Sequence, residues 1–147
     1  MGAKTGGEKV NKNLICTVIG TAGAYLAGLF GGMDGSIITL FIFMGIDYAS
    51  GLICAVVFHR SSKSESGCAE SKASFKGLIR KGMVLLLVIV GVRMDLIIGA
   101  SYIRDGICIA FIVNEIISIT ENAALMGIPM PEILLNAIDI VKDKSKK

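Results

Sequence analysis

Long apolar stretches separated by short polar segments dominate the chain. Four such stretches cover residues 14–33, 36–58, 82–102 and 106–126. A helix of ~20 apolar residues is long enough to cross a hydrocarbon layer of ~30 Å. The pattern therefore predicts an all-α integral membrane protein, a bundle of four transmembrane helices in which the first two spans form a helical hairpin.

The polar segments predict a loop and a surface helix. Residues 59–81 are rich in Ser, Lys and Arg, as expected of a solvated loop. Pro131 stands where a helix can begin, and apolar and polar residues then recur at helical spacing. Residues 131–147 are thus predicted to form a short amphipathic helix on the membrane surface, followed by a basic tail. Its apolar face would carry Leu134, Ile138 and Val141, and its polar face Glu132, Asn136, Asp139 and Asp143.

Composition agrees with a chain whose solvent is lipid. Hydrophobic residues make up 53% of the 147 residues, charged residues make up 18%, and the mean hydropathy is +0.71. These values are too apolar for a soluble domain of this length. The net charge of +3 is a weak sign of nucleic-acid binding, and we expect the lipid bilayer rather than nucleic acid to be the partner. We treat residues 1–147 as a single membrane domain.

The positions of the basic residues predict an orientation. Thirteen of the fifteen Lys and Arg residues fall in the N-terminal segment, in the loop 59–81 and in the C-terminal tail, and this count includes Lys81. By the positive-inside rule, these three segments face the cytoplasm, so both termini are cytoplasmic. A cleaved secretory signal over residues 1–27 is an alternative. It is less favoured, because the apolar run exceeds the usual core of ~7–15 residues and its loss would separate the basic clusters across the membrane.

Residues suited to catalysis or metal binding are sparse. The four cysteines form no CxxC pair, and His59 is the single histidine of the chain. There is no Ser/His/Asp constellation, no glycine-rich phosphate loop after a strand and no repeated metal-ligand spacing. We therefore expect a protein that is not an enzyme and holds no cofactor or metal.

Small residues follow one another at every fourth position of the first span. They are Gly20, Ala24, Gly28 and Gly32. Such a ridge lets helix backbones approach closely in lipid, where van der Waals contact drives helix association. The ridge is a candidate face for self-association between protomers, and packing against the second span is an equally good interpretation.

Charged residues near the middle of the spans are the second candidate feature. Asp47, Arg93 and Glu115 each lie near the centre of a predicted span, and each costs ~2.5–3.5 kcal/mol there. Asp95 lies in the same span as Arg93. The fourth span also carries a predicted polar face, made of Asn114, Glu115, Ser118, Glu121 and Asn122. These residues either pair in a structural salt bridge or line a water-filled path, and their spacing does not decide between the two.

Four short motifs carry a family resemblance. They are GIDYASG around Asp47, FKGLIRK before the third span, NEIISITEN in the fourth span and GIPMP after it. In this order and placement, the chain from Asp47 to Glu132 resembles the toxin-secretion and phage-lysis holin family.

The resemblance implies a function. Such a protein accumulates in the bacterial cytoplasmic membrane, forms homo-oligomers and opens lesions at a set time, so that an endolysin escapes and the host lyses. Some relatives assist toxin export instead. Two alternatives come from other classes of protein. One is a small ion channel or transporter subunit, in which the charges bind an ion. The other is a membrane scaffold that recruits partners through its basic loop.

Overall fold

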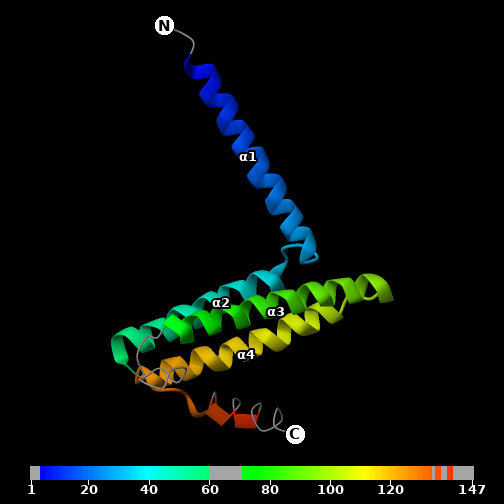
Figure 1. Cartoon of the computed structure of the whole chain (residues 1–147). Coiled ribbons are helices and arrows are strands. Elements are labelled where there is room, and N and C mark those ends of the chain that lie inside the picture. Colours follow the sequence, from blue (N-terminus) through cyan, green and yellow to red (C-terminus); the bar gives the residue numbers. More distant parts are fainter. Residues whose placement is uncertain (1–3, 60–70, 134, 137–138, 141–147) are drawn as a thin grey trace.

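The chain is helical throughout the part that the structure describes. The computed structural model describes residues 4–59, 71–133, 135–136 and 139–140 (Figure 1). Its helices are α1 (Lys4–Leu29), α2 (Gly35–Ile53) with a π-helical continuation η1 (Cys54–Phe58), α3 (Ser71–Ile98) and α4 (Ile103–Leu125). No strand occurs in these ranges, and the all-α prediction is confirmed for them.

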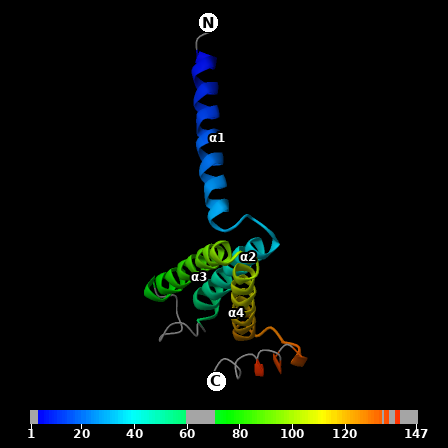
Figure 2. The same ribbon diagram turned by 90° about the vertical axis from the view of Figure 1, so that its right-hand side faces the viewer.

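Helices α2, α3 and α4 form a three-helix bundle in which α4 packs against both other helices (Figures 1 and 2). Helices α2 and α4 run in the same direction and α3 runs against them. As a result, the α1–α2 and α3–α4 turns lie at one end of the bundle. The end of η1, the start of α3 and the end of α4 lie toward the other end.

The bundle is apolar both inside and outside. Its buried core consists of Ile37, Leu40, Met44, Val88 and Cys108. The outer surface also carries large apolar side chains, such as Ile42, Leu86 and Ile109, each more than half exposed. Exposed apolar surface of this breadth is rare on a soluble monomer and typical of helices that contact lipid.

Helix α1 leaves the bundle instead of packing on it (Figures 1 and 2). Its side chains from Lys12 to Leu26 are exposed. The helix ends at Leu29, and Gly31 and Gly32 follow with φ angles of 74° and 104°, a left-handed conformation that glycine adopts without strain. This turn directs α1 away from α2. The expected hairpin, with the first two spans packed together, is therefore wrong.

The third helix is longer than the apolar run that predicted it. Helix α3 begins at Ser71, so residues 71–81 of the predicted loop are helical. Basic residues there suggested a loop, but inward-facing positions recur at helical spacing through this segment.

Within the residues that the structure describes, two helical segments are long and apolar enough to cross a membrane, Gly35–Phe58 and Ile103–Leu125. They coincide with the second and fourth predicted spans. The four-span topology remains a prediction.

The C-terminal amphipathic helix is only partly within the described residues. Residues 132–133, 135–136 and 139–140 have helical backbone, and their side chains are exposed. Outside the described residues lie the predicted apolar face (Leu134, Ile138 and Val141), Asp143 and the basic tail.

Candidate functional site

Three charged side chains from three helices meet inside the bundle. Lys81 of α3 places its Nζ atom 3.0 Å from Oδ2 of Asp47 in α2 and 2.5 Å from Oε2 of Glu115 in α4. The side chain of Lys81 is 13% exposed, and those of Asp47 and Glu115 are each 5% exposed. One ammonium group thus forms ion pairs with two buried carboxylates.

Two neutral side chains of α4 complete this group. Oδ1 of Asp47 accepts hydrogen bonds from Oγ of Ser118 at 2.6 Å and from Nδ2 of Asn122 at 3.1 Å. Nδ2 of Asn122 also donates to Oγ of Ser50 at 2.9 Å. We call Lys81, Asp47, Glu115, Ser118 and Asn122 the Lys81 cluster. It joins α2, α3 and α4 by polar contacts in a core that is otherwise apolar.

Helical spacing explains why these side chains face inward. Lys81 precedes Val84, Leu85 and Val88 by three, four and seven residues, and these three pack in the core. Positions separated by three, four or seven residues lie on one face of a helix. By the same rule, Asp47 follows the core residue Met44 by three positions.

The cluster is sensitive to the loss of one charge. Burying an ion pair costs desolvation energy that the attraction between the partners only offsets when the geometry and hydrogen bonds are good. Removing one partner leaves an uncompensated buried charge, which typically costs about 3–5 kcal/mol. The Lys81 cluster can therefore hold three helices together and also favour their separation when its charges no longer balance.

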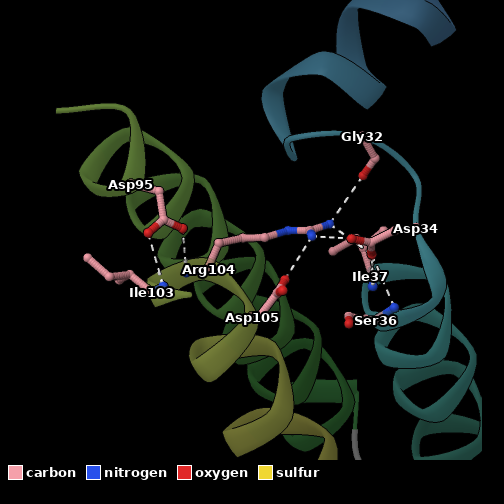
Figure 3. A network of polar contacts seen from close by, with 8 residues as sticks. All are labelled: Gly32, Asp34, Ser36, Ile37, Asp95, Ile103, Arg104 and Asp105. Atoms are coloured by element: carbon pink, nitrogen blue, oxygen red, sulfur yellow. Dashed lines mark hydrogen bonds and ion pairs between the residues drawn. The ribbon is translucent and has the colours of Figure 1, made fainter. Parts of the chain in front are cut away.

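A second polar network lies at the end of the bundle where α1 begins to depart (Figure 3). Arg104, in the first turn of α4, donates through Nη2 to Oδ1 of Asp34 at 3.0 Å and through Nη1 to the other oxygen of the same carboxylate. It also reaches Oδ1 of Asp105 at 2.9 Å and the carbonyl oxygen of Gly32 at 3.3 Å. This bidentate ion pair connects the turn between α1 and α2 with α4.

Asp34 has a second role at the start of α2. Its Oδ1 accepts hydrogen bonds from the backbone N–H groups of Ser36 and Ile37, both at 3.1 Å, and so caps the helix. The hydrogen bonds from Arg104, aided by these backbone donors, hold the pKa of Asp34 below its usual value.

Asp95 closes the turn between α3 and α4 (Figure 3). Its two carboxylate oxygens accept hydrogen bonds from the backbone N–H groups of Ile103 and Arg104, both at 3.0 Å. The N–H groups in the first turn of a helix have no acceptor within the helix. The N-cap residue Tyr102 makes no side-chain capping bond to them, so Asp95 takes this role. Asp95 was predicted as an intramembrane polar residue, and the structure gives it a capping contact at the end of the bundle.

The predicted intramembrane charges are brought together only in part. Asp47 and Glu115 share a cation, but it is Lys81 and not Arg93, which is exposed. The expected joint pairing of Asp47, Arg93 and Glu115 is therefore wrong in its basic partner. The reason is the position of Arg93 near the end of α3, two residues beyond Gly91, which lies against Arg104 in the first turn of α4.

The predicted polar face of the fourth span is divided. Glu115 and Asn122 are buried and Ser118 is partly buried, and all three belong to the Lys81 cluster. Asn114 and Glu121 are exposed on another side of α4. The two groups of residues lie at different angles around the helix. The prediction from spacing had assigned all of them to one face.

The ridge of small residues lies on a helix outside the bundle. Gly20, Ala24 and Gly28 are exposed, and nothing lies within 4 Å of a Cβ atom placed at either glycine. Gly32 is beyond the end of α1, in the turn, so it does not extend the ridge. The role of the ridge in self-association stays a prediction.

Three residues of these networks were not predicted from the sequence as functional. Lys81 falls in the predicted loop 59–81, and Asp34 and Arg104 fall between predicted spans. A signal for Lys81 was present, because it shares the spacing of the inward-facing Val84, Leu85 and Val88. Asp34 also stands directly before an apolar run, which is a usual place for a helix cap.

Metal binding finds no support in the described ranges, where no group of three His, Cys, Asp or Glu side chains could hold a metal ion.

Comparison with known proteins identifies a family. The sequence profile of the bacteriophage holin family matches residues 24–143. This match confirms the resemblance expected from the four motifs, and it extends over most of the chain.

Individual relatives cover most of the same region. An uncharacterized protein of Clostridium perfringens is 34% identical over 136 residues, 90% of this chain and 95% of the relative. An uncharacterized protein of Listeria monocytogenes is 37% identical over 124 residues, 84% of this chain and 83% of the relative. A Bacillus phage phi105 protein named "Probable holin" is 29% identical over 98 residues, 66% of this chain and 67% of the relative. No solved structure matches the chain.

Proposed function

Because the chain belongs to the bacteriophage holin family, we propose that it accumulates in the bacterial cytoplasmic membrane, assembles into homo-oligomers and opens lesions. An endolysin then passes through the lesions and degrades the cell wall, and the host lyses. The observation that carries this proposal is the family match over residues 24–143. No catalytic step in this chain is required.

The bundle supports a multi-pass topology for the proposed holin. Helices α2, α3 and α4 alternate in direction (Figure 1), as three consecutive crossings of a bilayer must. We further propose that α1 is a fourth crossing, once it turns at Gly31 and Gly32 to align with the bundle. Both termini and the connection between α2 and α3 would then lie on the same side. The positive-inside rule makes this side the cytoplasm.

The site supports a change between a closed and an open arrangement. In the closed bundle, the charges of the Lys81 cluster are paired and shielded from lipid. In the proposed lesion, the helices have separated, and the same polar side chains line a path that water can enter. The exposed ridge of Gly20, Ala24 and Gly28 on α1 is the proposed contact between protomers.

Induced expression tests this function. The chain is produced in a bacterium with or without a cytoplasmic endolysin that has no export signal, and culture turbidity is followed. We expect rapid clearing only when both proteins are present, and no clearing with the endolysin alone. If the chain lets ions pass but the endolysin stays inside the cells, the protein is an ion channel and the proposal is wrong.

A further inference from the structure

Lys81 connects α3 with both other helices of the bundle. Among the ion pairs of the described residues, those of Lys81 are the ones that link α3 to α2 and to α4. The ion pairs of Arg104 involve only Asp34 and Asp105, both outside α3. Loss of Lys81 would thus remove both of these ion pairs in one step, whereas the capping contact of Asp95 with the start of α4 would remain.

The ammonium group lies well inside the bundle rather than at its edge. Its partner Glu115 is near the middle of the apolar segment Ile103–Leu125, and Asp47 is near the middle of Gly35–Phe58. The apolar run of α3 begins only after Lys81, at Gly82. Sequence position alone would therefore assign Lys81 to the membrane boundary, whereas its contacts place it at the depth of two intramembrane carboxylates.

We propose that Lys81 holds the resting state closed, and that separation of its ammonium group from Asp47 and Glu115 is the step that commits the bundle to open. This inference rests on the proposed lesion-forming function. Both carboxylates contact the same nitrogen, at 3.0 and 2.5 Å, so without it two like charges face each other in a medium of low dielectric constant. Separation of the helices relieves this repulsion by admitting water.

The proposal makes opposite predictions for two sets of substitutions. Lys81→Met removes the cation that the two acids share but keeps most of the side-chain volume. The triple variant Lys81→Met, Asp47→Asn, Glu115→Gln removes all three charges. The first should favour opening, and the second should restore closure, because no repulsion remains. Lys76→Met is the matched control, since Lys76 is exposed on the same helix.

Two measurements are made on each variant. The first is the time from induction to lysis in cells that also contain the endolysin, at equal membrane accumulation on an immunoblot. The second is the rate at which N-ethylmaleimide alkylates the protein in membranes before lysis. The background is Cys16→Ser, Cys68→Ser, which retains the buried Cys54 and Cys108, 1% and 0% exposed.

The expected result is specific to the charges. Lys81→Met should lyse early and be alkylated faster by about a hundredfold to several thousandfold, the range expected for an uncompensated buried charge. Lys76→Met should behave like the parent. The triple variant should be alkylated as slowly as the parent, because no like charges face each other in its bundle. If Lys81→Met fails to accumulate but the triple variant accumulates, the repulsion between the two acids that lost their shared cation is the cause and the proposal holds.

Two results would overturn the inference. One is a Lys81→Met variant with unchanged lysis time and unchanged alkylation. The other is a triple variant that is alkylated as fast as Lys81→Met, because Lys81 would then matter for packing and not for its charge. A parent chain that never releases the endolysin would refute the proposed function instead. The alkylation rates would still report whether Lys81 keeps the bundle closed.

Discussion

Replacing Gly91 with alanine should force α3 and α4 apart where the two helices touch. A Cβ atom at this position would lie 2.8 Å from Cδ1 of Ile107, 3.0 Å from Cα of Arg104 and 3.3 Å from the backbone nitrogen of Arg104. The end of the Ile107 side chain can rotate away. The backbone of Arg104 can yield only if α4 moves, and Arg104 is held at the same time by Asp34, Asp95 and Asp105.

The size of the effect follows from two opposing contributions. Overpacking a close contact costs about 1–3 kcal/mol. Alanine in a helix is more favourable than glycine by about 0.5–1 kcal/mol. Gly82→Ala in the same helix is the control, because nothing lies within 4 Å of a Cβ atom there. The two variants share the helical gain, so the free energy of unfolding of Gly91→Ala should be lower than that of Gly82→Ala by about 1–3 kcal/mol.

Titration with SDS of the purified protein in mixed micelles, followed by circular dichroism, measures this difference. Both variants and the parent are titrated under the same conditions, and the unfolding midpoints and slopes are compared. If Gly91→Ala and Gly82→Ala are both at least as stable as the parent, α3 and α4 do not approach each other at Gly91 and the packing described above is incorrect. A loss of the same size in both variants would instead indicate that glycine is needed for a reason other than space.

Three further predictions concern the end of the bundle where Arg104 lies, and the same titration measures them. Asp95→Ala removes the acceptor of two backbone N–H groups and should lower the free energy of unfolding by about 1–2 kcal/mol. Asp95→Asn keeps one acceptor oxygen and should lower it by less. Equal losses in the two variants would contradict the capping role. Arg104→Lys keeps the charge but cannot form the bidentate ion pair with Asp34, so it should lower the free energy of unfolding by about 1 kcal/mol. An unchanged free energy of unfolding would argue against that ion pair. Because its pKa is lowered in the folded protein, ionised Asp34 should stabilise the fold above its ordinary pKa of 3.8 and lose this effect as the pH falls through the lower folded value; Asp34→Asn should abolish that pH dependence.

The existence of the helices could be predicted from the sequence because apolar runs of this length have few other stable conformations in lipid. The residue at which α3 begins could not be predicted in this way. Lys76, Arg80 and Lys81 lie close together, and such a group usually marks a solvated loop. In the structure two of them, Lys76 and Arg80, are exposed on the helix, while Lys81 faces the core. The exit of α1 was also beyond prediction, since it depends on a turn that a residue distant in sequence, Arg104, holds in place.

The choice of Lys81 rather than Arg93 as the buried cation follows from where α3 and α4 turn. The sequence placed that turn at Arg104 and Asp105, which would set Arg93 level with Glu115. The turn instead lies between Ile98 and Ile103, and Gly91 rests against Arg104. At ~1.5 Å per residue, Lys81 lies ~15 Å from Gly91 along α3, and Glu115 lies ~16 Å from Arg104 along α4, so the two meet. Arg93 is ~18 Å from Lys81 along the same helix and cannot reach that level. A displacement of the turn by a few residues therefore decides which cation lies level with Glu115. Periodicity along α3 indicates that Lys81 faces inward, but it contains no information about that level.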